Sequence, residues 1–583
     1  MSRHATSHSA ESAPMSSAQE QLWLLDQMLA ETQAYNVQSV FRLRGDVEPN
    51  LFARTLCELV HRHASLRTSL DEANGVTQQR LWPPSALTLP LSWHDLRRSD
   101  PEVTAGEVAR LAERDCRTPF ALDQAPLWRA LLARTGEREH VLVLTMHHAV
   151  TDAASMQLLV AEVCRLYAAF RDGLPSPLPP LSTTMTDVAL EEQRIRQSDA
   201  FARQRAYWRE QLAGAPEALR PLAGRPWTPT PHQHGAVITR SLPKPVSARV
   251  EALGRRLRAS SFMVCLASYV TLLHRYTART DIVVGTTFST RGPGQEGVLG
   301  NFVNCLPLRV DVSGSPTFEE LVHRVRRTVL GALRHQAVPF GQIVRDVADG
   351  RPALYHPVFQ TLFSLTRLKD GWHNPGLEAE PVPGPPGATA KFDLSLLLDQ
   401  NAAGLRVVAE YATALYDREP VERLVRTWAA LLDKLTDAPA TRVDDPSLPS
   451  PEVRDRPDPE PVAAATTVPG RLMDAAASAG AEPDSKVDVD AVVAIWSDVM
   501  GVDALGPGDD FFELGGHSLL AIRITARVSA AWDVDLPMTL LLQHPVLRDF
   551  ASAVADVLAQ AEGPPPPAGH PAALTNATSE DLR

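Results

Sequence analysis

The sequence predicts an α/β or α+β protein of two lobes, followed by a linker and a small all-α bundle. Three observations support this. Helical and strand-like periodicities are mixed from residue 15 to about residue 438, proline-rich stretches interrupt the chain, and a purely helical pattern follows from residue 486. With 583 residues, the chain is longer than one hydrophobic core usually serves, so several compact units are expected.

The first lobe is expected over residues 15–180, after a disordered N-terminus at residues 1–14. Ser16 can cap a helix whose apolar residues recur at helical spacing. A proline-rich segment at residues 173–182 separates this lobe from the next. Further expected elements of the first lobe are a strand at 36–43 and a helix at 51–61.

The second lobe is expected over residues 181–438. A buried tryptophan, Trp208, is expected to serve packing alone. The expected elements are a long polar helix at 186–212, helices at 247–257 and 262–276, and strands at 281–286 and 305–312.

The remaining chain is expected to hold a flexible linker and a compact helical unit. Residues 439–485 are rich in Pro, Ala, Asp and Ser without sustained periodicity, which predicts the linker. Residues 486–560 carry apolar side chains at helical spacing, which predicts a small bundle. The proline-rich tail at 561–583 is expected to be disordered.

Composition excludes several classes of partner. Acidic residues outnumber basic ones, 69 against 57, so the charge pattern of a nucleic-acid binder is absent. The N-terminus lacks the apolar stretch of a signal peptide, and no run of about 18 apolar residues is free of charge. Five scattered cysteines form no CxxC pair and are expected to be reduced core thiols. A cytoplasmic protein without membrane or nucleic-acid partners is predicted.

His147, His148 and Asp152 form an HHxxxD pattern after the apolar run 141–146. In one interpretation, an imidazole at the end of a strand faces a cleft as a base or hydrogen-bonding group. A metal site is disfavoured, because neighbouring residues on a strand point to opposite faces and no third ligand cluster is evident. Two structural histidines at a strand end are the third interpretation. The motif alone does not decide between the first and the third.

Ser518 follows Gly515, Gly516 and His517 at the expected start of an amphipathic helix. It could be a helix N-cap, a hydrolase nucleophile or an attachment site for phosphopantetheine. A hydrolase elbow needs glycine two residues after the serine, but Leu520 stands there. A helix N-terminus offers amides and a positive dipole to a phosphodiester, which favours attachment.

Six motifs in consistent order resemble the condensation domains of nonribosomal peptide synthetases, over residues 14–440. The resemblance implies a V of two chloramphenicol-acetyltransferase-like lobes, with a tunnel between them open at both faces. The motifs are SSAQEQLWLL (16–25), HRHASLRTSL (61–70), MHHAVTDAAS (146–155), VLGNFVNCLPLRV (298–310), RHQAVPFGQIV (334–344) and HPVFQTLFSL (356–365).

This resemblance implies roles for the histidine motif. His148 is the catalytic residue that faces the tunnel, and it either acts as a base or orients the nucleophile. His147 is buried and structural, and Asp152 holds the loop through an ion pair. The basic partner of Asp152 is predicted to be Arg67, with Arg62 as the second choice.

Two further positions belong to the active-site motifs by the same resemblance. Ala153 stands where the family usually has glycine, and its methyl group is predicted to narrow the choice of acceptor or to weaken activity. Asn304 belongs to the stretch around the channel and is expected to be structural.

The segment DDFFELGGHSLLAIRI at 509–524 resembles the attachment motif of peptidyl carrier (thiolation) domains. The resemblance implies a four-helix carrier bundle in which Ser518 bears covalent 4'-phosphopantetheine, added by a phosphopantetheinyl transferase from coenzyme A. Gly515, Gly516, His517 and Leu519 form the carrier motif around the attachment site, and no metal is expected.

The function expected is a condensation and carrier didomain of antibiotic or other secondary metabolism. An amide would form between a donor acyl or peptidyl thioester and an amine acceptor tethered to Ser518. Because no adenylating domain lies between the two parts, a separate adenylating enzyme is expected to load Ser518. The other expected partners are an upstream donor carrier acting in trans and a downstream synthetase or thioesterase.

Three alternatives stay open. The product could be an ester, or the acyl group could pass from the local carrier to a free small-molecule amine. A different class is a catalytically silent docking platform whose only working part is the carrier domain.

Overall fold

The computed structural model divides into two compact units, Met1–Val468 and Pro469–Arg583. They are described separately below. The residues described are 10–28, 33–73, 76–97, 100–216, 219–225, 234–347, 358–374, 376–382, 389–452, 489–500, 505–511, 518–532, 536, 540–541 and 544–561.

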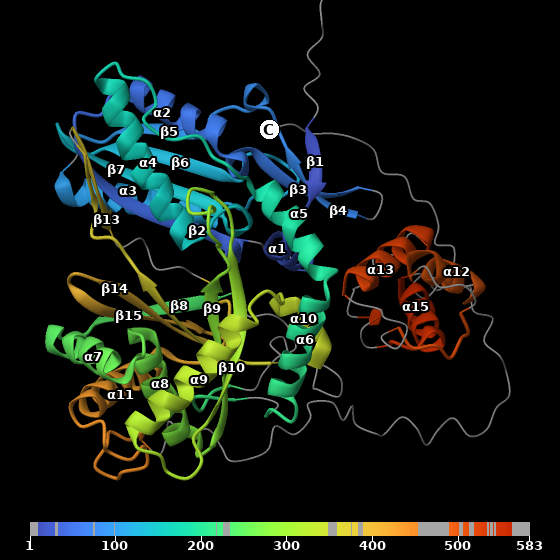
Figure 1. The fold of residues 1–583 in the computed structure, drawn as a ribbon. Helices are drawn as coiled ribbons and strands as arrows, with labels where there is room; N and C mark the ends of the chain where they lie inside the picture. Colours follow the sequence, from blue (N-terminus) through green and yellow to red (C-terminus); the bar gives the residue numbers. More distant parts are fainter. Residues whose placement is uncertain are drawn as a thin grey trace, which may run out of the picture. The chain divides into compact units, whose positions relative to one another are not determined.

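The N-lobe of the first unit is a six-stranded sheet with helices on both faces (Figure 1). Its strand order is β12-β13-β2-β7-β6-β5, and a smaller sheet of order β1-β4-β3 adjoins it. Helix α3 packs on one face of the sheet, where Leu111 and Ala112 contact Val40 and Val143. Helix α4 contacts α2, and it also contacts the strands β12 and β13. The elements are β1 (Glu11–Pro14), α1 (Ser17–Met28), β2 (Asn36–Gly45), α2 (Pro49–Arg62), β3 (Thr68–Ala73), β4 (Val76–Leu81), β5 (Leu91–Asp95), α3 (Pro101–Arg117), β6 (Trp128–Arg134), β7 (Glu139–His147) and α4 (Ala153–Arg171).

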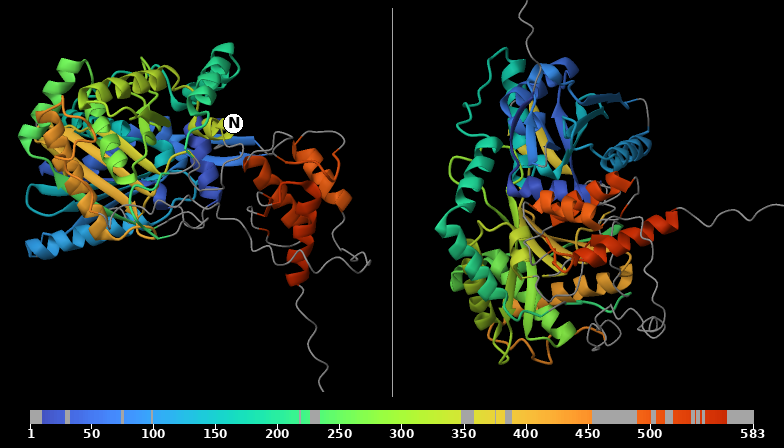
Figure 2. Two further views of the ribbon diagram at one scale, coloured as in Figure 1. Left: turned by 90° about the horizontal axis from the view of Figure 1, so that it is seen from below. Right: turned by 90° about the vertical axis from the view of Figure 1, so that its right-hand side faces the viewer.

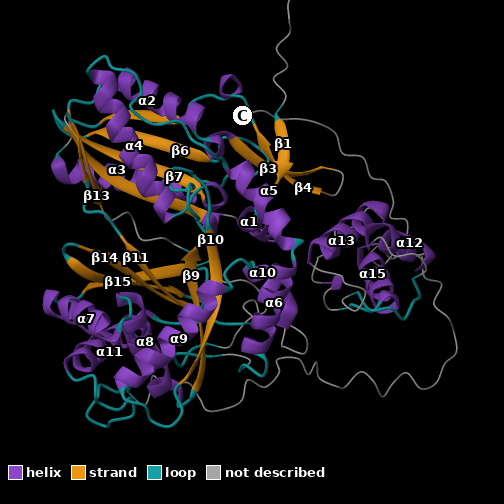
Figure 3. Cartoon of the chain, viewed as in Figure 1, coloured by secondary structure: helices purple, strands orange, loops and turns teal. Residues whose placement is uncertain are grey.

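The C-lobe holds a second six-stranded sheet, of order β10-β9-β11-β14-β15-β8. Helices α7, α8, α9 and α11 cover one face of it (Figures 1 and 3). The elements from this part of the sequence are α5 (Met185–Arg196), α6 (Asp199–Leu212), β8 (Gly235–Ser241), α7 (Lys244–Leu257), α8 (Ser261–Thr277), β9 (Asp281–Ser289), β10 (Val303–Asp311), α9 (Phe318–Arg334), α10 (Phe340–Val347), β11 (Thr361–Arg367), β12 (Trp372–Asn374), β13 (Leu377–Val382), β14 (Leu394–Asn401), β15 (Gly404–Ala412) and α11 (Arg418–Asp437).

Strand alternation explains how the C-lobe sheet presents two different faces. On β15, Leu405, Val407 and Ala409 are buried in the core, whereas Val408 and Glu410 are partly exposed. Residues two apart on a strand share a face, so the apolar set packs under the helices and the other set lines the opposite face. That opposite face is therefore available to carry polar groups.

Two strands from the C-lobe sequence belong to the N-lobe sheet, which the predicted boundary at residue 181 did not anticipate. β13 pairs antiparallel with β2 from Leu377↔Gly45 to Val382↔Val40, and β12 extends the sheet beyond β13. The ring of Trp372 meets that of Phe41 edge-on, with centroids 5.7 Å apart. Pairing of strands so distant in the sequence leaves no local signal, so the simple division of lobes was wrong here.

Three other predicted boundaries need correction. The segment 11–14 is not disordered, because it pairs with β4 as β1. The helix predicted at 186–212 is two helices, because Ser198 caps α6 by accepting a hydrogen bond from the Phe201 amide. The linker does not begin at residue 439, since Val443 and Leu448 are buried in the C-lobe core and the Val443 amide donates to the carbonyl of Pro316.

The second unit is helical, as predicted. Its described residues include α12 (Val489–Met500), α13 (Ser518–Trp532) and α15 (Leu547–Ala561), three of the four helices expected. Trp496 is fully buried at the centre and contacts the rings of Phe511 and Phe550. In Figure 2 the helices of this unit, coloured orange to red, lie close to one another.

Helix α4 is long and apolar enough to cross a membrane, but 61% of its apolar window is buried inside the N-lobe. Burial against a sheet explains the apolar composition of such a helix. Of the five cysteines, Cys164 and Cys265 are core thiols as predicted, whereas Cys57 is exposed, and all five are free.

Candidate functional site

His148 lies in a one-turn 3-10 helix, His148–Val150, between the end of β7 and the start of α4. Its Nδ1 is 2.9 Å from the carbonyl oxygen of Thr151. A carbonyl only accepts hydrogen bonds, so Nδ1 carries the proton and Nε2 keeps its lone pair. The half-buried ring is thus held in the tautomer that can accept a hydrogen bond at Nε2.

The surroundings of His148 keep its imidazole neutral. Burial lowers its pKa to about 4, and the positive charge of Lys391 acts in the same direction, against the weaker opposing effect of Asp152. At neutral pH the ring is therefore uncharged and can accept a proton or a hydrogen bond.

His147 is buried, with 1% of its surface exposed. Its Nδ1 accepts a hydrogen bond from the Ala149 amide at 3.2 Å, and its ring meets that of Phe120 edge-on. Burial lowers its pKa to about 3, so it stays neutral. This environment supports the structural role expected of His147.

Asp152 is held by three groups at once. One carboxylate oxygen accepts from the Ser155 amide at 2.7 Å and caps α4, and the other accepts from the Phe302 amide at 3.1 Å. The guanidinium of Arg291 completes the set with an ion pair of 3.4 Å, and both side chains are almost buried. Asp152 thus joins the start of α4 to a loop of the C-lobe.

The prediction that Arg67 or Arg62 pairs with Asp152 was wrong. Arg67 Nη1 donates to the carbonyl of Trp82 at 2.9 Å, and Arg62 pairs with Glu162 at 3.2 Å. Both arginines are thereby bound elsewhere in the N-lobe. The actual partner, Arg291, lies two residues after the end of β9 in the other lobe. Only its position shortly after a predicted strand could have pointed to it.

The loop between β9 and β10 binds the N-lobe at two more points. The Ser155 hydroxyl donates to the carbonyl of Gly300 at 2.8 Å, and the Ser65 hydroxyl donates to the carbonyl of Leu299 at 2.6 Å. An added Cβ at Gly300 would lie 2.3 Å from the sulfur of Met185. The Met185 side chain would therefore have to move if any other residue stood at this position of the loop.

Asn304 organises the segment before α10. Its Nδ2 donates to the carbonyls of Gln336 and Val338 at 3.0 and 2.8 Å, and its Oδ1 accepts from the Phe340 amide at 3.0 Å. One amide side chain thus satisfies three backbone groups, which supports the structural role expected of Asn304.

Replacement of Asn304 by alanine is expected to lower the free energy of unfolding by about 2–4 kcal/mol, because it leaves three backbone groups without partners. Urea unfolding checks this. Asn304→Asp should also destabilise, since a carboxylate cannot donate to Gln336 and Val338. Asn401→Ala, which removes one hydrogen bond in an exposed turn, is the matched control and should cost less than about 1 kcal/mol. Equal losses for Asn304→Ala and the control would contradict the role.

Ala153 occupies the first position of α4 and is exposed. It is not among the described residues with positive φ, so alanine fits the backbone without strain. The departure from glycine at this position therefore costs the fold nothing, and its effect on acceptor choice stays a prediction.

Ser518 is the first residue of α13. The helix N-terminus presents unpaired amides and positive dipole, which fits a covalently attached phosphodiester. When bound, phosphopantetheine supplies a thiol for a thioester. Gly515, Gly516 and His517 lie outside the described residues, as does the side chain of Leu519.

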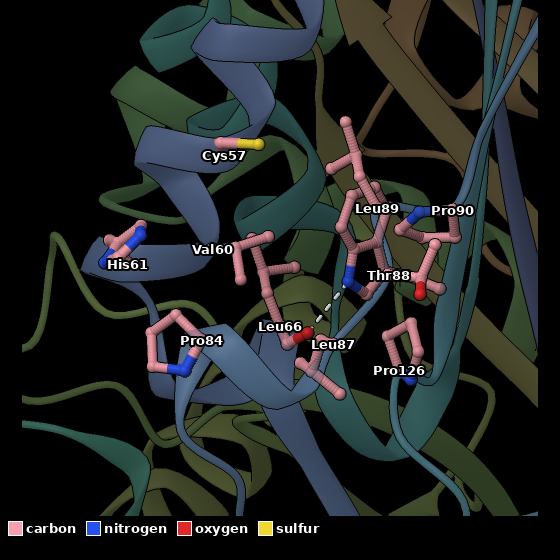
Figure 4. Close-up of a pocket in the computed structure, with 11 residues that line it drawn as sticks. Cys57, Val60, His61, Leu66, Pro84, Leu87, Thr88, Leu89, Pro90 and Pro126 are labelled. Carbon is pink, nitrogen blue, oxygen red and sulfur yellow. Dashed lines mark hydrogen bonds between the residues drawn. The ribbon is translucent and has the colours of Figure 1, made fainter.

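A small cavity of about 50 Å³ lies elsewhere in the N-lobe (Figure 4). Cys57 and His61 from α2 face Pro84 and Leu87 across it, and Trp128 donates to the carbonyl of Leu66 at its base. It has room for only about one or two water molecules. This cavity is separate from the His148 turn.

Together, the fold and the site define a two-lobed condensing protein joined to a carrier unit. The chain belongs to the condensation-domain family: residues 9–456 match the model described as Condensation domain, and residues 490–554 match that described as Phosphopantetheine attachment site. Condensation domains of nonribosomal peptide synthetases form amide bonds, so the first match places this chain among amide-forming enzymes. The second match implies that a serine bears covalent 4'-phosphopantetheine.

Curated relatives are much longer than this chain. Malpinin synthetase from Mortierella alpina is 35% identical over 426 residues, which is 73% of this chain and 5% of that protein. Phosphinothricin tripeptide synthetase PhsB from Streptomyces viridochromogenes is 34% identical over 458 residues, which is 78% of this chain and 38% of that protein.

Solved structures share the fold of the first unit. The X-domain from teicoplanin biosynthesis has a TM-score of 0.65 and 28% identity over 74% of this chain and 96% of its own. The first condensation domain of the calcium-dependent antibiotic synthetase, in complex with a substrate analogue, has a TM-score of 0.65 over 75% of this chain and 99% of its own. At 24% identity, the second likeness supports the fold alone.

Proposed function

We propose that this didomain forms an amide between a donor acyl or peptidyl thioester on another carrier protein and an amine acceptor tethered through phosphopantetheine to Ser518. The observation that carries the proposal is His148, held with a neutral Nε2 at the turn where the N-lobe meets the loop of the C-lobe. A neutral ring nitrogen is the group needed to accept a hydrogen from an attacking amine.

In the reaction, the amine nitrogen forms a bond to the thioester carbonyl carbon, and the carbon–sulfur bond breaks. The proton lost by the amine ends on the leaving thiolate, which becomes a free thiol. A thioester is already reactive, so alignment of amine and carbonyl supplies much of the acceleration as a high effective molarity. His148 contributes by accepting the amine N–H at Nε2, as a base or as an orienting group.

Several partners follow from this proposal. A separate adenylating enzyme is inferred to load Ser518, because only residues 457–489 lie between the two family matches. A phosphopantetheinyl transferase modifies the serine, a second carrier brings the donor, and a downstream synthetase or thioesterase takes the product. We infer a cytoplasmic setting in antibiotic or related secondary metabolism, since that is where acyl donors and coenzyme A would be supplied.

Attachment at Ser518 is tested by intact mass after incubation with a phosphopantetheinyl transferase and coenzyme A. The full chain should gain one phosphopantetheine group, and Ser518→Ala should gain none. Ser529→Ala, in the same helix, is the matched control and should be modified like the parent protein. Modification of Ser518→Ala, or none of the parent, would overturn the assignment.

A second candidate is a docking platform without condensation activity. One solved structure similar to this chain is a complex of the X-domain and OxyB from teicoplanin biosynthesis, with a TM-score of 0.65 and 26% identity. Under this alternative, the two lobes would bind a partner protein while only the carrier works. Product formation from a loaded donor carrier separates the two, because a platform alone makes none.

Ester formation and transfer to a free amine are separated by the acceptor supplied. A hydroxy acid on Ser518 that gives product where an amino acid does not would favour ester formation. Product on a soluble amine with the Ser518→Ala protein would favour the free acceptor.

A further inference from the structure

Lys391 reaches from the C-lobe toward the histidine turn of the N-lobe. It lies just before β14, and its Nζ is 5.8 Å from the centre of the Tyr35 ring. Tyr35 directly precedes β2, whose first residue, Asn36, pairs with His147 at the end of β7. The ammonium group therefore lies at the end of β7 where His148 begins its turn.

The segment that carries Lys391 is fixed by Glu410. The backbone amide of Lys391 donates to Glu410 Oε1 at 3.2 Å. Glu410 lies on the face of β15 opposite the helices, next to Val408 in the alternation. Burial raises the pKa of Glu410, and Lys391 opposes that rise, so the two side chains interact electrostatically.

The charge of Lys391 is not matched by an ion pair. Among the residues the structure describes, the ammonium makes no hydrogen bond or salt bridge, and its one recorded contact is with the Tyr35 ring. Asp152, whose charge raises the pKa of His148, is already paired with Arg291. Lys391 thus places a positive charge beside the histidine turn without an ion pair among the described residues, with the carboxyl of Glu410 near it.

The groups that act on His148 come from both lobes. His147 and Asp152 lie on its own segment, Arg291 reaches Asp152 from the β9–β10 loop, and Lys391 approaches from before β14. Lys391 also lowers the pKa of the partly buried Cys305 thiol on β10, against the effect of burial, so its charge acts on three groups of this site. In contrast to a histidine backed by a carboxylate, this ring has a neutral carbonyl at Nδ1, and the nearby Lys391 adds a positive charge.

We propose that Lys391 is a positioning residue of the condensation site: its ammonium group adds to the effect of burial in keeping the His148 ring neutral, so that Nε2 remains free to accept the hydrogen of the acceptor amine. Glu410 holds the segment that carries Lys391 in place. This inference rests on the proposed function for its use in catalysis, but the electrostatic effect can be measured without product formation.

The test follows the His148 ring by NMR on the full chain labelled at histidine, between about pH 3 and pH 8. The His148 signal is assigned by its loss in His148→Gln. In Lys391→Gln the pKa of His148 should rise by about half a unit or more, because a nearby positive charge is removed. Lys391→Arg should restore the parent value, and Lys244→Gln, which removes an exposed charge at the start of α7, should change nothing.

A second variant keeps the test valid if Lys391→Gln does not fold. Lys391→Met keeps an unbranched side chain without the charge, so the pKa of His148 should rise in it as in Lys391→Gln. In single-turnover condensation assays, the acidic limb of the rate profile should move to higher pH in both variants and stay in place in Lys391→Arg. The sign follows because only neutral His148 accepts the amine hydrogen, and a raised pKa leaves less of that form at low pH.

An unchanged His148 titration in folded Lys391→Gln or Lys391→Met protein, or an equal rise in Lys391→Arg, would overturn the proposal. Failure of the condensation function itself gives a different result. No product would then form from loaded carriers, while the titration of His148 would still respond to Lys391.

Discussion

Replacement of His148 by alanine is expected to slow amide formation by about 100-fold or more, because the neutral Nε2 that accepts the amine hydrogen is lost. The measurement is the single-turnover rate of product formation on the carrier, followed by intact mass. The starting protein bears an amino acid on Ser518 and receives a loaded donor carrier. His148 makes one hydrogen bond to its own turn, so the fold should survive the change.

Two controls make this result specific. Modification of Ser518 by the phosphopantetheinyl transferase should be unchanged in His148→Ala, since the carrier is a separate unit. The free energy of unfolding should fall by less than about 1.5 kcal/mol, the usual contribution of one hydrogen bond. An undiminished rate in a folded His148→Ala protein would remove the histidine from the mechanism and favour the docking platform.

The second large effect is expected on stability, in Asp152→Ala. Removal of this carboxylate takes away the cap of α4 and the acceptor of the Phe302 amide, and it leaves Arg291 buried without its anion. Loss of one partner of a buried pair costs about 3–5 kcal/mol. Urea unfolding should therefore show a decrease in the free energy of unfolding of this size.

Matched variants separate the three contributions of Asp152. Asp152→Asn keeps an oxygen for the Ser155 and Phe302 amides but removes the ion pair, so its loss should be smaller than that of alanine. The double variant Asp152→Ala with Arg291→Met should be more stable than Asp152→Ala alone, because no unpaired charge remains buried. A stable Asp152→Ala protein that has lost its activity would instead indicate a direct part in the reaction.

The sequence allowed the local elements to be predicted, because their signals are local. The helix start at Ser16, the strand from Asn36 and the helices of the carrier unit all depend on caps and periodicities within about a dozen residues. Sequence patterns also placed His148 at the end of a strand. These predictions are confirmed by the bounds of α1, β2, α12 and β7.

Features that depend on contacts between distant segments could not be predicted from the sequence. Arg291 and Asp152 are 139 residues apart, and the sequence around either residue gives no sign that the two form an ion pair. Lys391 was missed for the same reason, since its neighbour Tyr35 belongs to the opposite lobe. An arginine close in sequence was chosen for Asp152 because local motifs were the only guide, and the close arginines are bound by Trp82 and Glu162.

The pairing of β13 with β2 has a consequence for protein engineering. A fragment cut at the proline-rich segment after α4 would leave β2 as an open edge, with unpaired backbone groups and the ring of Phe41 uncovered. Such an edge is prone to aggregation. Chimeric synthetases that exchange one lobe should therefore take residues 372–382 from the same parent protein as the N-lobe. The N-lobe sheet then keeps all of its strands, although two of them come from the later part of the chain.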